Sequence, residues 1–166
     1  FLKGLTDRYE WVGRGVGASP SELLMALLLP QLEALSSITE QRRAVVRRYE
    51  EILTSRAWPE ILSFTRDCPE GNGHLFFVRF RSSVTAAAFM TFMQIREVDV
   101  RTHYQPLHAA PFGCGFRRDP ALESARDREM GACVVRLPMS HHFSESEIDY
   151  VCEVLNDALI HCHTGL

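Results

Sequence analysis

The sequence predicts an α+β protein in which a three-stranded sheet is covered by helices and preceded by a pair of helices. Three observations lead to this prediction. Residues 74–81 alternate side chains with the period of a strand, whereas residues 39–53 repeat apolar side chains every three and four positions, as an amphipathic helix does. Residues 74–104 then follow the order strand, helix, strand, which places a helix against the sheet.

The first helix of the pair is expected over residues 21–36. Ser19 or Ser21 can cap its N-terminus, and Pro20 is tolerated near a first turn. Pro30 is expected to kink the helix or to end it early, because proline lacks the amide proton of a helical hydrogen bond. The helix is apolar almost all round, so we expect another domain or another subunit to bury it.

The second helix and the first strand have clear periodicity. The helix at 39–53 carries arginines on its polar face, and turn-forming residues follow at 66–73. In the strand at 74–81, one set of side chains alternates with another: Phe76, Val78 and Phe80 against Phe77, Arg79 and Arg81. This alternation predicts a strand.

Four further elements are expected after this strand. A helix covers 85–97 and a second strand covers 98–104. A loop rich in glycine and arginine follows at 112–120, and a short helix lies at about 121–131.

The chain is expected to end with a strand and a helix. The third strand covers 132–138, and the closing helix covers 144–160. Ser144 and Glu147 have the spacing of a capping box, which predicts where this helix begins.

The composition limits the class of protein. The chain has 166 residues, of which 46% are hydrophobic and 23% charged, as in an ordinary globular protein. The net charge of −3, without a basic run, gives no reason to expect nucleic acid. The most apolar run, residues 23–32, is about half as long as a membrane-spanning helix, so no membrane partner is expected. Cysteines without C-x-x-C spacing favour a reducing cytoplasm over a disulfide framework.

One cluster of residues suggests a binding site. His103, Tyr104 and His108 follow the end of the second strand, in a turn stiffened by Pro106. These side chains can hold a substrate by hydrogen bonds, or can supply an acid or base near neutral pH. The alternative is a tyrosine that packs in the core and two histidines that bond backbone groups. The residues alone leave both interpretations open.

Three other motifs are expected to have no specific role. His141 and His142 are expected in a solvent-exposed loop, the HCH stretch at 161–163 at a frayed end, and GRGVGAS at 13–19 in an ordinary loop. The last stretch lacks the lysine of a phosphate-binding loop, and no serine or cysteine lies in a nucleophile motif. We therefore predict neither a metal site nor a catalytic residue in this chain.

Four motifs in order carry a family resemblance. The first runs from a Tyr-x-Trp-Val stretch into Pro-Ser-Glu-Leu and comprises Tyr9, Trp11, Val12, Gly15, Pro20, Ser21, Glu22 and Leu23. The later three are HLFFVRF, HYQPLH and VVRLPMSHHFSESEID. Together they resemble the PLP-dependent nucleotide-sugar aminotransferases of the DegT/DnrJ type, and most of all their dTDP-4-amino-4,6-dideoxygalactose transaminase branch. The resemblance covers essentially the whole chain.

The resemblance implies the C-terminal part of a fold-type-I PLP enzyme. Residues 1–55 would be the end of the large domain with connecting helices, and residues 56–166 the small α/β domain. The intact enzyme would be a cytoplasmic homodimer that transfers an amino group from glutamate to a 4-keto-6-deoxy sugar on a nucleotide diphosphate, for deoxyaminosugar and polysaccharide biosynthesis. His103, Tyr104 and His108 would line its sugar pocket.

The sequence also departs from the family pattern. Family members hold PLP through a lysine that precedes the segment present here, and Lys3, the single lysine, aligns well after it. Gly17, Ala18 and Ser19 replace the usual Asn, aromatic and Arg residues, and Pro30 replaces a helix former. The chain alone is therefore expected to bind no PLP and to be inactive. Two alternatives are a non-catalytic dimerisation or regulatory module of the same fold and an unrelated metal-binding α+β domain that uses the scattered histidines.

Overall fold

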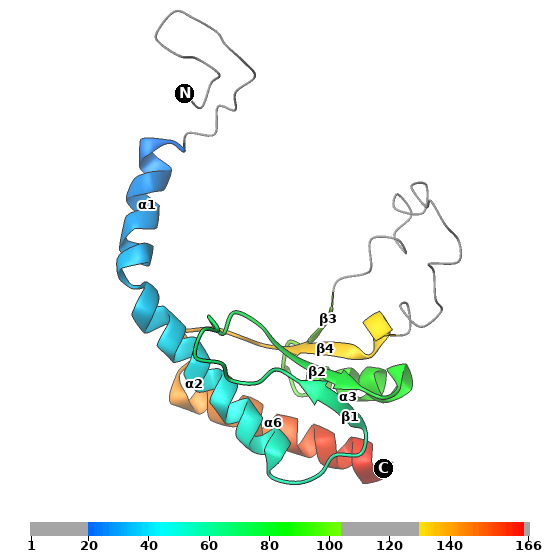
Figure 1. Ribbon diagram of the computed structural model, residues 1–166. Helices are drawn as coiled ribbons and strands as arrows, with labels where there is room; N and C mark the ends of the chain where they lie inside the picture. Colours follow the sequence, from blue (N-terminus) through cyan, green and yellow to red (C-terminus); the bar gives the residue numbers. More distant parts are fainter. Residues whose placement is uncertain (1–19, 104–129, 165–166) are drawn as a thin grey trace, which may run out of the picture. The chain divides into compact units, whose positions relative to one another are not determined.

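The computed structural model describes residues 20–103 and 130–164 (Figure 1). Contacts divide the chain into two compact units, residues 1–37 and residues 38–166. The expected boundary after residue 55 concerns the domains of the intact protein, and it stays a prediction.

In the first unit, helix α1 spans Glu22–Glu33. Ser21 is its N-cap and accepts a hydrogen bond from the amide of Leu24 at 3.3 Å. Pro30 lies inside the helix, which ends three residues later at Glu33, so the predicted early end is confirmed. All the large apolar side chains of α1 are exposed in the structure, although the sequence predicts a buried helix: Leu23, Leu24, Met25, Leu27, Leu28, Leu29 and Leu32.

Helix α2 spans Leu35–Thr54 and begins four residues earlier than the periodicity predicts. Its buried positions are Val45, Val46, Tyr49 and Leu53, which confirms the predicted apolar stripe. The Tyr49 hydroxyl donates to the carbonyl of Pro138 at 2.8 Å. Its ring meets the ring of Phe76 edge to face, with the centroids 5.1 Å apart. Tyr49 thus fastens α2 to the sheet.

The sheet has four strands in the order β1-β2-β4-β3, and each neighbouring pair is antiparallel. The strands are β1 (Ile61–Phe64), β2 (Phe76–Phe80), β3 (Arg101–Thr102) and β4 (Val134–Leu137). The α+β fold class is confirmed, but the predicted number of three strands is wrong. The sequence hides β1 because four residues at a sheet edge, with a bulge, are too short to show a period.

Within the second unit, α2, α3 (Ser83–Ile95) and α6 (Glu145–Thr164) all lie on one side of the sheet (Figure 1). Strand β4 lies between the parallel strands β2 and β3, so β2, α3 and β3 form a split β-α-β unit. The core between sheet and helices contains aromatic and aliphatic side chains from every layer. The predicted capping box is confirmed, since Ser144 and Glu147 exchange hydrogen bonds of 2.8 and 3.3 Å at the start of α6.

No single helix among the described residues is long and apolar enough to cross a membrane. Helices α1 and α2 taken together have the length and apolar composition of a membrane span, but they form a bent pair.

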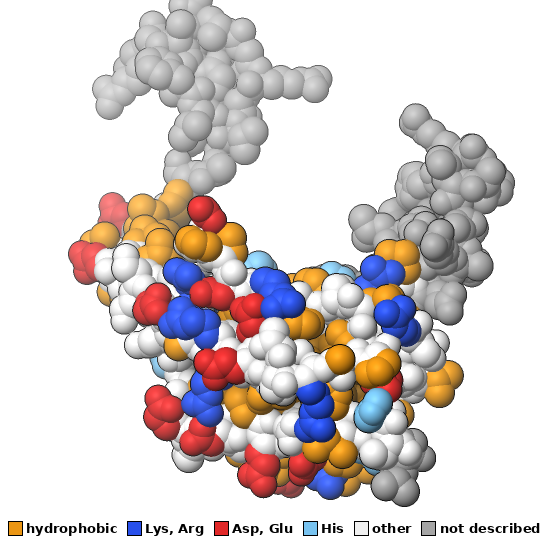
Figure 2. All heavy atoms as spheres, turned by 60° about the horizontal axis from the view of Figure 1, so that its bottom comes forward, with side chains coloured by type: hydrophobic (Ala, Val, Ile, Leu, Met, Phe, Trp, Pro, Cys, Tyr) orange, Lys and Arg blue, Asp and Glu red, His pale blue; other side chains and the backbone are white. Residues whose placement is uncertain are grey.

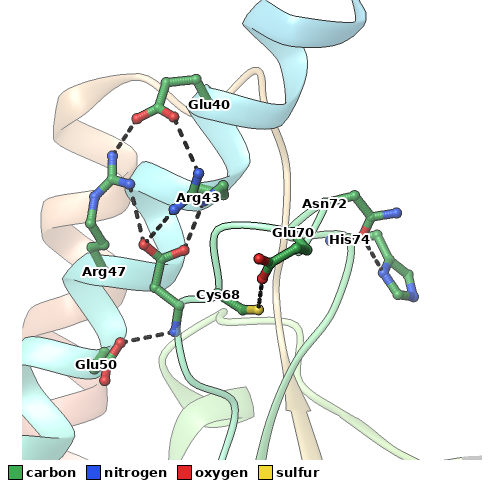
Figure 3. A network of polar contacts seen from close by, with 9 residues as sticks. Glu40, Arg43, Arg47, Glu50, Cys68, Glu70, Asn72 and His74 are labelled. Atoms are coloured by element: carbon green, nitrogen blue, oxygen red, sulfur yellow. Dashed lines mark hydrogen bonds and ion pairs between the residues drawn. The ribbon is translucent and has the colours of Figure 1, made fainter.

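Charged side chains of both signs are interspersed on the helix-covered side (Figure 2). The most connected group joins α2 to the segment after β1 (Figure 3). Arg43 donates two hydrogen bonds to the Asp67 carboxylate, at 2.9 and 3.0 Å, and Arg47 adds a contact at 3.5 Å. Glu50 accepts from the Asp67 amide at 3.0 Å and from Arg66 at 2.8 Å. This network holds the loop before β2 against α2.

We predict that Asp67→Asn lowers the Tm by about 2–4 °C at neutral pH. The Arg43 hydrogen bonds hold the pKa of Asp67 below its ordinary value, so the carboxylate stabilises the folded state above its unfolded pKa of about 3.9. This contribution is lost as the pH falls through the lower, folded pKa, so the difference between variant and wild type should vanish in acid. Calorimetry across acid and neutral pH measures it.

Glu145→Gln is the matched control for this substitution. Its carboxylate lies 3.7 Å from Arg48, and its side chain is 92% exposed, so the Tm should stay almost unchanged. An Asp67→Asn effect that persists unchanged in acid would contradict the role assigned to the carboxylate.

Candidate functional site

The sheet has a core face and an open face, because side chains alternate along each strand. Phe76, Val78 and Phe80 of β2 are fully buried toward the helices, as the alternation predicts. Their neighbours Phe77 and Arg79 are half-buried and point the other way. The strand register assigns to this same side Val134 and Arg136 of β4, Arg101 of β3 and Ser63 of β1. We call these six side chains the open face.

Three arginines from three different strands meet on the open face. Arg101 lies directly opposite Arg136 in the β3–β4 register. Arg79 lies opposite Val134, which makes it the diagonal neighbour of Arg136 on β2. Like charges in such positions repel each other, so the sheet gains nothing from this arrangement in isolation.

The three guanidinium groups are satisfied to different degrees. Arg101 forms an ion pair with Asp99, with atoms 2.7 Å apart. The Nε atom of Arg136 donates to the carbonyl of Thr102 at 3.2 Å. The Nε atom of Arg79 is buried, and it has no hydrogen-bond partner among the described residues. Because burial of an unsatisfied polar group is costly, Arg79 is the position at which an acceptor is expected.

A cavity of about 390 Å³ lies at one end of the open face. Its polar lining comes from Arg101, Arg136, Asp99 and His74. Apolar surface completes the lining, from Leu75, Leu137, Pro138 and Met139. Pockets of this size with a few convergent polar groups suit small-molecule ligands.

Of the three predicted site residues, His103 alone lies in the described part of the chain. His103 is exposed and directly follows β3, where its amide donates to the carbonyl of Val134 at 3.2 Å. By strand alternation it lies on the same side as Arg101. Tyr104 and His108 lie outside the described residues. Their grouping with His103 therefore stays a prediction.

A second cavity of about 480 Å³ lies between α2 and the segment that joins β4 to α6. His141 and His142 line it, with ring centroids 3.7 Å apart. Burial, and next the charges of His142 and Arg42, lower the pKa of His141, which favours a neutral ring at physiological pH. Arg48 in the same lining bonds Asp149. This cavity is thus less suited to an anion than the open face.

The described residues hold no group that could anchor PLP covalently or bind a metal through a cluster. None of them is a lysine, and the single lysine, Lys3, lies outside the described part. Within residues 20–103 and 130–164, no group of three or more His, Cys, Asp or Glu side chains could hold a metal ion.

The sequence matches the model of the DegT/DnrJ/EryC1/StrS aminotransferase family over residues 3–156. This match covers well over half of the chain, so the protein belongs to that family. The resemblance inferred from the four sequence motifs is thereby confirmed.

Solved structures share the fold over most of this chain. An apo-form described as a sugar aminotransferase of Streptococcus pneumoniae has a TM-score of 0.77 at 20% identity, over 98% of this chain and 42% of that one. DesV of S. venezuelae, in complex with a ketimine intermediate, has a TM-score of 0.77 at 23% identity, over 95% of this chain and 41% of that one. PseC of Helicobacter pylori, an aminotransferase involved in the biosynthesis of pseudoaminic acid, has a TM-score of 0.75 at 13% identity, over 99% of this chain and 44% of that one. The chain thus spans about two fifths of each.

Proposed function

We propose that this chain is the C-terminal part of a PLP-dependent aminotransferase that transfers an amino group from glutamate to a nucleotide-linked 4-keto-6-deoxy sugar. Family membership over residues 3–156 is the observation that carries the proposal. The basic open face beside His103 supports it, since such a substrate brings both hydroxyl groups and phosphates to be bound. PLP would supply the amino-transfer chemistry, and the part of the protein that holds it would precede this chain.

The residues that are present suggest which part of the reaction this chain contributes to the intact enzyme. The described part offers no lysine for a Schiff base, so we propose that this chain alone is inactive and carries no PLP. Its own residues bind and orient the substrate. His103, exposed at the end of β3, would hydrogen-bond the sugar, with Tyr104 and His108 in the same pocket. The intact enzyme would work as a cytoplasmic homodimer in deoxyaminosugar biosynthesis.

We predict that His103→Gln in the intact enzyme raises the KM for the nucleotide sugar about ten-fold and leaves kcat nearly unchanged. One lost hydrogen bond to substrate accounts for a factor of this size. Steady-state amino transfer from glutamate measures both constants. The fold should be unaffected, because His103 is exposed.

His163→Gln is the matched control. This histidine is also exposed, but it contacts Glu60 at 2.9 Å and lies on α6, on the helix side of the sheet. It should leave the KM unchanged. An unchanged KM in His103→Gln would remove His103 from the sugar pocket.

A second candidate is a non-catalytic dimerisation or regulatory module of the same fold, which the absence of lysine from the described residues favours. The same assay separates the two functions. Turnover by the intact protein supports the enzyme, whereas an intact protein that folds but transfers no amino group supports the module.

A further inference from the structure

We infer that Arg136 of β4 is a positioning residue, which fixes the backbone at His103 through a hydrogen bond to the carbonyl of Thr102. The consequence for substrate binding, correct placement of the His103 imidazole against the sugar, rests on the proposed function. The fixing of the backbone does not, because it follows from contacts within the described strands.

The peptide group between Thr102 and His103 is held by β4 at both of its polar atoms. The amide of His103 donates to the carbonyl of Val134 at 3.2 Å. The Nε atom of Arg136 donates to the carbonyl of Thr102, also at 3.2 Å. A peptide group is planar and includes the Cα atom of the residue that follows, so these two bonds together fix the point from which the His103 side chain starts.

The carbonyl of Thr102 receives no hydrogen bond from the backbone of β4. Opposite residues on antiparallel strands alternate between hydrogen-bonded and non-hydrogen-bonded pairs. Since His103 bonds Val134, the neighbouring pair of Thr102 and Val135 is a non-hydrogen-bonded one. Strand β3 is also at the edge of the sheet, and no strand of the described residues lies on its other side. Arg136 therefore supplies a hydrogen bond that the strand pairing does not give.

An arginine at position 136 does not favour the stability of the sheet. It lies directly opposite Arg101, and like charges in such positions repel each other. Arg101 forms its own ion pair with Asp99, with atoms 2.7 Å apart. A β-branched or aromatic side chain would suit a strand better than a second cation here. Residues that act against local stability in this way are typical of functional sites.

Few other contacts hold the end of β3, which has only two residues. The chain before it is anchored, because Val98 and Val100 are buried and Gln94 donates to the carbonyl of Val100 at 3.3 Å. Beyond this anchor, the residues of β3 are exposed. One side-chain hydrogen bond at Thr102 is therefore expected to have a large effect on local opening of the strand end.

Hydrogen exchange of the His103 amide in the 166-residue chain tests the fixing of the backbone. Arg136→Met removes every donor, and we expect exchange at His103 about ten-fold faster. Arg136→Gln keeps a nitrogen donor as many bonds from Cα as Nε, but not the charge, so exchange should stay within about two-fold of wild type. The amide of Phe80, which donates to Cys133 at 2.8 Å, is the internal reference. Unchanged exchange at His103 in Arg136→Met would overturn the inference.

Steady-state kinetics of the intact enzyme test the consequence for substrate binding. Arg136→Met should raise the KM for the nucleotide sugar about ten-fold with kcat nearly unchanged, and Arg136→Gln should raise it by less than about two-fold. An equal rise in both variants would assign the effect to the charge and overturn the role of the hydrogen bond. A lower Tm with an unchanged KM would make the role purely structural and overturn it too. Circular dichroism establishes that each variant is folded.

A double-mutant cycle tests whether Arg136 acts through His103. If it does, His103→Gln combined with Arg136→Met should have the KM of His103→Gln alone, about ten-fold above wild type. A rise of about a hundred-fold, the product of the two single effects, would mean that they act independently and would overturn the inference.

Arg56→Met is the matched control, since this exposed arginine has its guanidinium 4.4 Å from the ring centroid of Trp58, after α2. It should change neither the KM nor the exchange at His103. Effects as large as those of Arg136→Met would reduce the result to a general loss of charge and overturn the inference.

The two measurements separate this inference from the proposed function. Faster exchange at His103 in Arg136→Met, with no amino transfer by the intact wild type, would support the fixed backbone and end the proposed function. Unchanged exchange, in an active enzyme whose KM rises in His103→Gln, would overturn the inference and leave the proposed function standing.

Discussion

Tyr49→Ala will lower the free energy of unfolding by about 3–5 kcal/mol, as large aromatic truncations in protein cores do. The Tyr49 side chain is fully buried between α2 and the sheet, where its ring packs against Phe76. Truncation removes this contact and leaves the Pro138 carbonyl without its 2.8 Å hydrogen bond. Urea denaturation with a fixed m value measures the change.

Tyr49→Phe separates the ring from the hydroxyl. It keeps the packing and loses the bond to Pro138, so we expect a cost of only about 1 kcal/mol. Tyr150→Ala is the exposed control, since this tyrosine on α6 is 47% exposed. A loss in Tyr150→Ala as large as that in Tyr49→Ala would contradict the assignment of Tyr49 to the core.

The difference in stability between the wild type and Tyr49→Phe is also expected to depend on alkaline pH. Burial raises the pKa of the Tyr49 hydroxyl well above its ordinary value of about 10. Above that pH the unfolded chain releases the proton and the folded chain keeps it, so the stability of the wild type falls as the pH rises. Tyr49→Phe lacks this group, so the difference in the free energy of unfolding between the variant and the wild type should become smaller as the pH rises. A difference that grows would contradict the burial of the hydroxyl.

The elements that the sequence could predict are those in which a regular repeat of apolar side chains extends over many residues. Helix α2 and strand β2 each bury the residues that the spacing assigns to one face. Strand β3 was predicted too long, because Val98 and Val100 are buried yet precede the two residues that pair with β4. Strand order depends on contacts between residues far apart in the chain, such as Arg136 and Thr102, 34 positions apart. A pattern among neighbouring residues in the sequence cannot predict such contacts.

The candidate site shows the same limit. The alternation in β2 predicts that Arg79 points away from the core, and the chemistry of imidazole singles out His103. The register of β4 between β2 and β3 was required to place Arg101 and Arg136 beside Arg79. Until the strands are paired, the three arginines are scattered basic residues in the sequence.

The 166-residue chain will self-associate through helix α1. Its large apolar side chains are exposed over 42–72% of their surface, from Leu28 at the low end to Leu23 at the high end. Contiguous apolar surface of this kind is normally covered by another domain or subunit. Full burial of each leucine contributes about 1.5–3 kcal/mol, so a few of them suffice to drive association. Sedimentation velocity should show a weight-average mass that rises with concentration.

The double substitution Leu24→Lys and Leu28→Lys should abolish this association, because the two positions lie one turn apart on one side of α1 and lysine preserves helix propensity. Removal of residues 1–37 should have the same effect, since residues 38–166 form a compact unit with its own core. Val84→Lys changes an apolar residue on α3 that is still more exposed, at 77%, and it should leave association unchanged. Association that survives the double substitution would assign it to a different surface. Association lost in all three variants, Val84→Lys included, would assign it to general hydrophobicity rather than to the helix that the sequence predicts to be buried against a neighbour.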